Sequence, residues 1–317
     1  FTANGGSMDL SALSSINGTG GYAFFYAQGG STLALPALTS VGNSAFDADT
    51  GATVRLAGPQ PIDYSTRGFS WGSVNPLYAA GAGSLLDAPA IRSIDASFDD
   101  LSGAQTIHYV QSLAGAQVRL PNVTNVTVPK RAEDVLEFHA NGGSMDLSTL
   151  SSINGTGGYA FFYAQGGSTL ALPVLASAGN SVFEADTGGT VRLAGPQPID
   201  YSTRGFYWGA VSPLYAVGTG SLLDAPAIRS IDASFDDLSG GQTIHYVRSL
   251  AGAQVRLPNV TNVTVPKRVE DLVDFNANGG SMDLSALSSI NGTGGYAFFY
   301  AQGGSTLALP ALTSVGN

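Results

Sequence analysis

Short apolar stretches recur along the chain, each a few residues behind a glycine, with a spacing that suits strands. After Gly30, apolar side chains occupy Leu33, Leu35, Leu38 and Val41. An i, i+2 pair such as Leu33 and Leu35 points to one face of a strand, and the positions three and six residues further on restart that face after a bend. No segment keeps the i, i+3, i+4, i+7 spacing of an amphipathic helix. The pattern predicts short strands joined by tight turns.

The same apolar template follows five glycines in succession. These are Gly5, Gly30, Gly51, Gly83 and Gly115. Nineteen of the twenty template positions hold Leu, Ile, Val, Met or Ala, and the exception is Pro59. We interpret each glycine and its template as one coil of the backbone, with Gly and Pro at the bends.

A longer repeat contains these five coils. F-x-A-N-G-G-S-M-D-L-S begins at Phe1, Phe138 and Phe275, which makes the period 137 residues. The sequence therefore predicts two full units, 1–137 and 138–274, followed by a partial third unit, 275–317. Each full unit holds about five coils.

The segment F-F-Y-A-Q, just before Gly29, alternates in the same way and adds a further strand to its coil. This brings the expected number to roughly three short strands per coil. One coil cannot bury its apolar side alone, but coils stacked ~4.8 Å apart cover one another. The predicted fold is all-β, a parallel β-solenoid that runs continuously through the three units.

One coil resembles a known class of repeat protein. The stretch G-G-S-T-L-A-L-P-A-L-T-S-V-G-N-S-A-F, from Gly29 to Phe46, resembles the coils of bacterial right-handed parallel β-helix surface proteins, which form adhesin-like or filament-forming arrays. Its end is also similar to the I-G-x-x-A-F of leucine-rich repeats in bacterial surface antigens, a weaker likeness confined to one coil per unit. The β-helix resemblance implies a right-handed solenoid, a secreted or cell-surface location, and a scaffold or adhesive role.

Composition narrows the classes of partner. The chain has 13 basic and 23 acidic residues and a formal charge of −10, which disfavours a sequence-independent grip on nucleic acid phosphates. It has no cysteine, which excludes disulfides, thiolate zinc sites and cysteine nucleophiles. No apolar run approaches the ~20 residues that span a bilayer, so we expect no membrane insertion in this segment. Because no basic and apolar leader follows Phe1, we expect the sequence to be a piece of a larger protein.

Aromatic residues in the longest coils are the candidate ligand contacts. The segment F-S-W-G-S-V-N-P-L-Y lies in a long insertion, where function tends to collect. Aromatic rings can stack on sugar rings, although in a solenoid they more often pack in internal ladders. The candidates are Tyr64, Trp71 and Tyr78, with Tyr201, Trp208 and Tyr215 in the second unit.

One charge-dense segment per unit, P-K-R-A-E-D-V-L-E-F and its copy P-K-R-V-E-D-L-V-D-F, joins the fifth coil to the next unit. The simpler interpretation is a solvated connector whose mixed charge protects a strand edge. The alternative is a contact between rods, in which Lys130 and Arg131, or Lys267 and Arg268, meet acids on a neighbouring copy.

The densest carboxylate cluster raises an enzymatic alternative. It consists of Asp95, Asp99 and Asp100, with Asp232, Asp236 and Asp237 as its copy. Paired acids can donate and accept protons around a glycosidic bond, but Asp and Ser in I-D-A-S-F-D-D-L-S-G also favour a plain solvated loop. We expect the loop.

Metal and cofactor motifs are weak. No pair of histidines has metal-ligand spacing, and we expect His108 and His245 to be ordinary strand residues. Calcium is the one metal worth considering for an acidic repeat, yet D-A-D-T-G at Asp47 is shorter than an EF-hand loop. No cofactor is expected.

Together these observations favour a structural role over catalysis. We expect a rod or fibre segment of a secreted or cell-surface repeat protein, adhesive or self-assembling into filaments, whose partners are copies of itself, extracellular polysaccharide or a host surface. The alternative is a polysaccharide lyase or hydrolase, or a carbohydrate-binding protein, on the same solenoid.

Overall fold

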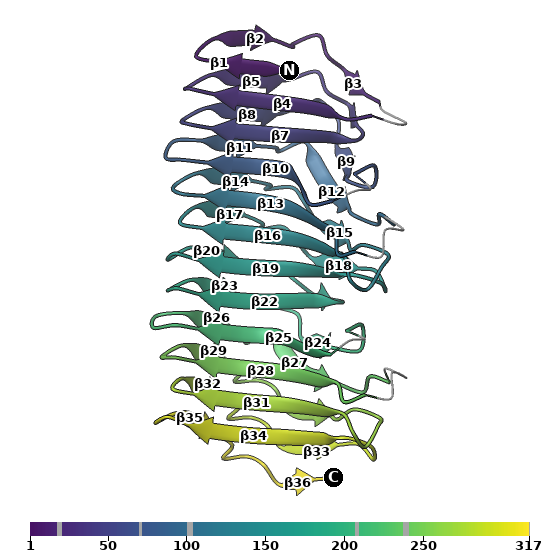
Figure 1. Ribbon diagram of the computed structural model, residues 1–317, viewed down its shortest axis with the longest axis vertical. Coiled ribbons are helices and arrows are strands. Elements are labelled where there is room, and N and C mark those ends of the chain that lie inside the picture. Colours follow the sequence, from purple (N-terminus) through teal and green to yellow (C-terminus); the bar gives the residue numbers. More distant parts are fainter. Residues whose placement is uncertain (18–20, 70–71, 100–103, 207–208, 237–240, 317) are drawn as a thin grey trace.

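The backbone winds through stacked levels, each of which contributes one strand to each of three faces (Figure 1). The computed structural model describes residues 1–17, 21–69, 72–99, 104–206, 209–236 and 241–316. Within these residues every ladder between named strands is parallel, and no helix occurs. The predicted all-β parallel β-solenoid, with roughly three strands per coil, is confirmed.

The longest strands, one per level, form a single twelve-stranded sheet, called the long sheet below. In chain order its strands are β1 (Thr2–Asn4), β4 (Ala23–Gln28), β7 (Ser44–Asp49), β10 (Val74–Ala80), β13 (Ile107–Leu113), β16 (Val135–Asn141), β19 (Tyr159–Gln165), β22 (Ser181–Asp186), β25 (Ala210–Val217), β28 (Ile244–Leu250), β31 (Leu272–Asn278) and β34 (Tyr296–Gln302). Five of these strands belong to each 137-residue period, in agreement with the predicted five coils.

The second face consists of short strands in two ladders of six. The first ladder contains β2 (Ser7–Asp9), β5 (Thr32–Leu35), β8 (Thr53–Leu56), β11 (Leu85–Asp87), β14 (Gln117–Arg119) and β17 (Ser144–Asp146). The second contains β20 (Thr169–Ala171), β23 (Thr190–Arg192), β26 (Leu222–Asp224), β29 (Gln254–Arg256), β32 (Ser281–Asp283) and β35 (Thr306–Ala308).

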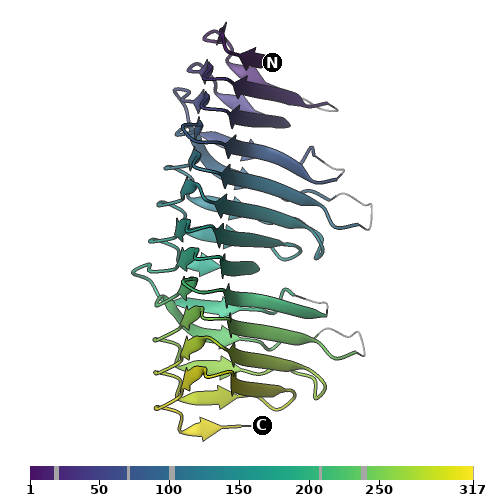
Figure 2. The same ribbon diagram turned by 60° about the vertical axis from the view of Figure 1, so that its left-hand side comes forward.

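The third face is divided into three ladders. They contain β3 (Ser15–Ile16) and β6 (Ser40–Val41); then β9 (Ile62–Ser65), β12 (Ile91–Asp95), β15 (Asn125–Thr127), β18 (Ser152–Asn154) and β21 (Ser177–Ala178); then β24 (Ile199–Ser202), β27 (Ile228–Asp232), β30 (Asn262–Thr264), β33 (Ser289–Asn291) and β36 (Ser314–Val315). The breaks fall just before β9 and β24, where G-P-Q-P precedes the strand and the prolines have no N–H to donate. The connections that return from this face to the long sheet run along one edge of the stack, on the right in Figure 2.

The boundary between units leaves no trace in the long sheet. Residues 137 and 138 lie inside β16, which pairs with β13 from Ile107↔Val135 to Ser112↔Ala140. One unit later, β28 and β31 pair in the same register, starting with Ile244↔Leu272. Each unit therefore continues the sheet of the preceding one.

The core occupies the interior of the stack, and the apolar template predicts it well. Fifteen of the twenty template side chains in the first unit are buried. The four in the first coil, such as Met8 and Leu13, are partly buried because only one neighbouring level covers them. Pro59, the exception in the template, is exposed at a corner.

Aromatic rings fill the inner side of the long sheet. Phe162 stacks between Phe138 and Phe183, with ring centroids 4.9 and 5.3 Å away. All three rings are fully buried. The parallel register places them on successive levels, so that each ring covers the next one along the axis.

Candidate functional site

Two of the six predicted ligand contacts, Tyr64 and Tyr201, lie in the core, so the prediction is wrong for them. Both side chains are fully buried. Tyr64 follows buried Ile62 at i+2 in β9 and points inward with it. Its hydroxyl donates a hydrogen bond to the carbonyl oxygen of Ser44, and burial raises the pKa of the phenol well above its ordinary value. Such a ring cannot contact a ligand at the surface.

Tyr78 and Tyr215 lie on the outer face of the long sheet. Tyr78 is half-buried in β10 between two buried residues, Leu77 and Ala79. Because Tyr64 points inward and Tyr78 outward, the structure does not bring these two predicted contacts together. The other two, at positions 71 and 208, fall outside the described residues.

Tyr78 belongs to a row of outward side chains on the long sheet, one per level, here called the outer column. In the first unit the register places Tyr26 beside Asp47 and Asp47 beside Tyr78. The corresponding residues of the second unit are Tyr163, Glu184 and Tyr215. In each unit one carboxyl group therefore lies between two tyrosines on adjacent levels.

These carboxyl groups are poorly solvated. Burial, together with the neighbouring Asp49 carboxylate, raises the pKa of Asp47 to about 6. Burial, with Asp186 and Glu137 nearby, raises the pKa of Glu184 to about 7. Oδ1 of Asp47 is buried and accepts no hydrogen bond from the described residues. Raised carboxyl pKa values of this kind are typical of functional positions, although packing alone can also produce them.

Glu137 and His139 form a second titratable pair on the same face. Glu137 is buried, which raises the pKa of its carboxyl group to about 7. Its Oε1 lies 3.4 Å from Nδ1 of His139, whose own pKa is lowered by burial. Nε2 of His139 is 3.0 Å from the side-chain oxygen of Gln165. The pair favours its neutral forms.

The free energy of unfolding is expected to fall as the pH rises from about 4.5 to above 7. Since the folded-state pKa of Glu137 lies above the ordinary 4.5, its contribution is complete below pH 4.5 and is lost toward pH 7 and above. Glu137→Gln keeps the shape without the buried charge, so we expect it to raise the free energy of unfolding by roughly 2 kcal/mol at pH 8. Urea unfolding of both proteins at pH 5 and pH 8 measures this. An equal pH dependence in the two proteins would contradict it.

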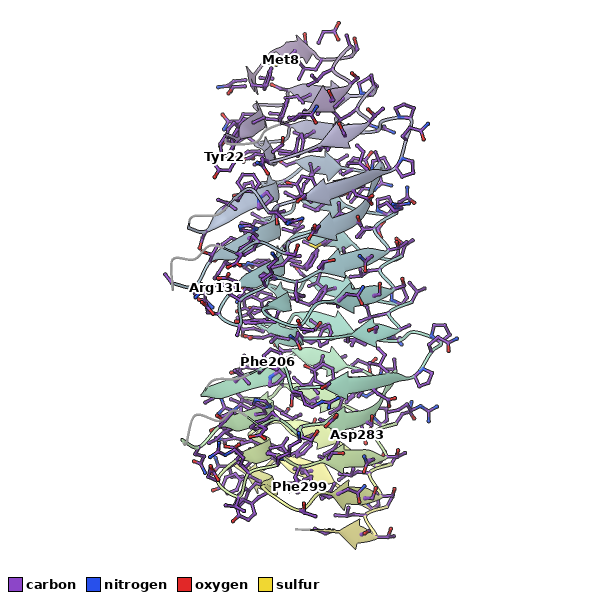
Figure 3. All side chains as sticks on the ribbon, turned by 90° about the vertical axis from the view of Figure 1, so that its right-hand side faces the viewer. Met8, Tyr22, Arg131, Phe206, Asp283 and Phe299 are labelled. Atoms are coloured by element: carbon purple, nitrogen blue, oxygen red, sulfur yellow. The ribbon has the colours of Figure 1, made fainter. Side chains whose placement is uncertain are left out.

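In the charge-dense segment Lys130 is exposed and Arg131 is half-buried, whereas residues 134–138 are buried. Arg131 is seen at the edge of the stack in Figure 3. The guanidinium of Arg131 pairs with Glu133 of the same segment at 2.6 Å, and Arg268 pairs with Glu270 at 2.7 Å. Lys130 and its copy, Lys267, are exposed, and neither forms an ion pair with a described residue. The lysines are therefore the more available of the four predicted inter-chain contacts.

The carboxylate cluster serves the local turn. Oδ1 of Asp95 accepts a hydrogen bond from the backbone N–H of Ser97 at 2.9 Å, and Asp232 accepts one from Ser234 at 3.0 Å. Asp95 also lies 3.8 Å from the guanidinium of Arg67. Asp99 and Asp236 are described, whereas positions 100 and 237 fall outside the described residues. The described carboxylates thus match the loop interpretation.

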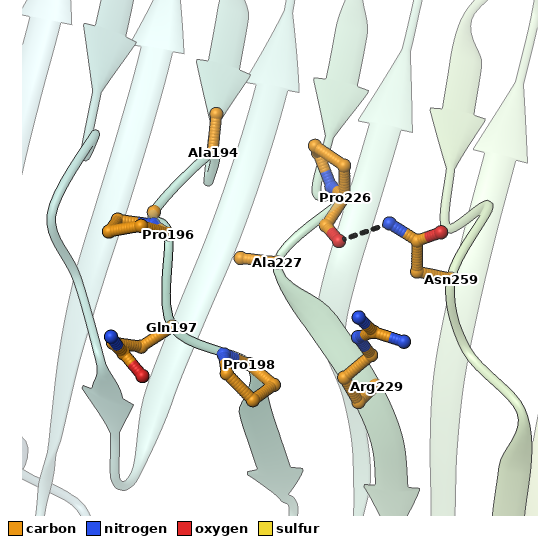
Figure 4. A pocket seen from close by; sticks show the side chains of 9 residues that line it. Ala194, Pro196, Gln197, Pro198, Pro226, Ala227, Arg229 and Asn259 are labelled. Atoms are coloured by element: carbon orange, nitrogen blue, oxygen red, sulfur yellow. Dashed lines mark hydrogen bonds between the residues drawn. The ribbon is translucent and has the colours of Figure 1, made fainter.

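A groove recurs once per unit beside the G-P-Q-P corner (Figure 4). Its volume is about 350 Å³ in the first unit and about 240 Å³ in the second. Pro196 and Gln197 form one side and Arg229 the other, while Asn259 donates a hydrogen bond of 2.7 Å to the carbonyl oxygen of Pro226. The amide that borders the groove is thus engaged in holding two levels together.

No group of three or more His, Asp or Glu side chains with metal-binding geometry occurs among the described residues. In the same part of the chain, no helix has the length and apolar character needed to cross a bilayer.

His108 is fully buried in β13. Its ring nitrogens form hydrogen bonds with the Thr66 hydroxyl at 2.8 Å and the Phe69 carbonyl at 2.9 Å, which hold the segment between β9 and β10 against the long sheet.

The outer column was not among the predicted sites, although the sequence contains a signal for part of it. Tyr26, Asp47 and Gln111 each stand four residues before a coil glycine, and Tyr78 stands five before. Aligning the coils on their glycines places Tyr26, Asp47 and Gln111 in one row and leaves Tyr78 one position out of it. The apolar template lies behind each glycine, whereas the outer column lies in front of it.

Comparison with known proteins gives no relative. No protein-family model, no curated protein and no solved structure matches this chain.

Proposed function

We propose that this chain is a structural rod segment of a cell-surface or secreted repeat protein, and that its rods associate with one another. The observation that carries the proposal is the continuity of the long sheet across the unit boundary, where β13 pairs with β16 in the register that β28 and β31 repeat. Units joined in this way add length without a hinge, and such continuity suits a load-bearing or spacing element.

Association between rods is proposed to involve Lys130 and Lys267. Lys130 and Lys267 are exposed and carry ammonium groups on a chain whose formal charge is −10. Reversing both charges, Lys130→Glu with Lys267→Glu, should leave the circular dichroism spectrum and the unfolding midpoint unchanged, because neither side chain packs in the core. Sedimentation velocity at low salt should then show the variant as a monomer where the parent forms larger species. Equal association of both proteins would contradict the lateral contact.

The proposed location can be tested separately. Antibodies against the chain should label intact cells that make the protein, before any permeabilisation. Labelling that requires permeabilisation would contradict a cell-surface location, and absence of the protein from the culture medium would then contradict secretion.

We further propose that the rod is not an enzyme. Asp95 and Asp232, from the predicted catalytic cluster, both cap turns in their own loops. Incubation with acidic and neutral polysaccharides should release no new reducing ends and no unsaturated products. Release that is lost in Asp95→Asn with Asp232→Asn would revive the enzymatic alternative.

A further inference from the structure

We propose that a hollow in the outer column at Asp47 binds the ammonium group of a lysine side chain from a second copy of this chain. The occupant rests on the self-association proposed above, whereas the ammonium-binding chemistry of the hollow does not. The binding of an ammonium group in the hollow and the association of two copies can therefore be disproved independently.

The hollow has a volume of about 230 Å³. Phe24 and Tyr26 form one wall, with their rings nearly parallel and 6.0 Å apart. Ala45 and Asp47 form the floor, and residues 73–75 form the opposite rim. A register shift in β10 after Val74 belongs to this rim.

The chemistry of the hollow suits an organic cation. The Asp47 carboxylate lines the hollow, and an ammonium group supplies three N–H donors for it. Asp49 adds a second negative charge nearby, and Phe24, 40% exposed, presents an aromatic ring of the kind that attracts cations. A neutral ligand would leave the two carboxylates uncompensated.

The second unit shows the same face with a cation of its own. There Arg248 lies beside Tyr215 in the outer column, and its guanidinium carbon is 3.4 Å from the centroid of the Tyr246 ring. The equivalent neighbour of Tyr78 in the first unit is Gln111, which is neutral. An aromatic ring of this outer face thus accepts a side-chain cation in the second unit, whereas Gln111 brings no such charge to the first.

The chain's exposed lysines are suitable donors. Lys130 and Lys267 are exposed and form no ion pair with a described residue, so their ammonium groups are available to a carboxylate on a second copy. In the second unit Val182 takes the place of Ala45, so the contact is proposed for Asp47 alone.

The binding chemistry can be measured with n-butylammonium as the probe and n-butanol as its neutral control. Titrations followed by NMR amide shifts should give saturable shifts around Asp47 with the amine only. Asp47→Asn should weaken binding by about tenfold. Ala45→Val, which introduces the residue found at the equivalent position, Val182, should fill the hollow and weaken binding similarly, whereas Glu184→Gln should change it less than about twofold.

Binding of the probe should also weaken at least about fivefold between pH 7 and pH 5, because Asp47 titrates in this range. The titratable groups that face it are Asp49 on its own strand, Tyr26 on β4 and Tyr78 on β10. No saturable binding of the amine, or binding unaffected by both Asp47→Asn and Ala45→Val, would overturn the site.

The source of the ammonium group is tested by carbodiimide coupling, which joins a contacting amine and carboxyl group as an amide. In a mixture of ¹⁵N-labelled and unlabelled chains, mass spectrometry should find mixed-isotope peptides linking Lys130 to Asp47. If n-butylammonium binds but no such link forms, the lysine source is overturned and the proposed self-association is weakened. If glucosamine binds and n-butylammonium does not, the site recognises an amino sugar and the lysine proposal fails.

Discussion

Phe162→Ala is expected to lower the free energy of unfolding by about 4 kcal/mol, the largest single loss that we predict. The Phe162 ring is fully buried and stacked between Phe138 and Phe183 on the adjacent levels. Removing it opens a cavity against two rings at once, and the long sheet cannot collapse to close that cavity because its strand spacing is fixed by hydrogen bonds.

Urea unfolding followed by circular dichroism measures this loss. Phe161→Ala is the matched control, because Phe161 is the preceding residue of β19 and points to the outer face. We expect about 1 kcal/mol or less for the control. Equal losses for the two variants would contradict the assignment of inner and outer faces in β19.

Gly143→Ala is expected to cost about 3 kcal/mol for a different reason, overpacking between levels. A Cβ atom on Gly143 would lie 2.5 Å from the Ser112 hydroxyl oxygen and 2.6 Å from the Ser112 carbonyl oxygen. Both atoms belong to the preceding level, which contains β13. The Ser112 hydroxyl itself donates a hydrogen bond of 2.9 Å to the carbonyl oxygen of Ala116. Moving the hydroxyl breaks this hydrogen bond, and moving the carbonyl disturbs the ladder between β13 and β16.

The repeat provides its own control for this substitution. Gly6 is the equivalent residue one unit earlier. A Cβ atom there would meet nothing within 4 Å, because Gly6 lies in the first level of the stack. We expect Gly6→Ala to change the free energy of unfolding by less than about 0.5 kcal/mol. Thermal unfolding of the two variants side by side distinguishes a clash between levels from an intrinsic demand for glycine.

Much of this fold can be predicted from the sequence, because the core positions of a solenoid recur as a short repeated pattern of apolar residues. The glycine template of one coil, Leu33 to Val41, is enough to predict the buried positions of the others, since each level meets a near-copy of itself. The three-strand coil and the five coils per unit follow from the same pattern.

The surface was harder to predict, because it depends on register between coils. The aromatic pattern predicts a surface ring at Tyr64, yet its i+2 relation to Ile62 places it inside, in register with Ile94 of the next level. Asp47 meets Tyr26 and Tyr78 only through pairing across 21 and 31 residues of sequence, and the lengths of the connections decide which side chains become neighbours. The spacing before each coil glycine indicates part of this row, and only the register of the strands completes it with Tyr78.

The central claim is that the backbone forms one continuous stack through all units. Electron microscopy of chains with two, three and four units tests it most directly. The account predicts rods of constant width that lengthen by ~24 Å per unit, the advance of five levels. Globules separated by flexible gaps, or a much larger increment per unit, would contradict it.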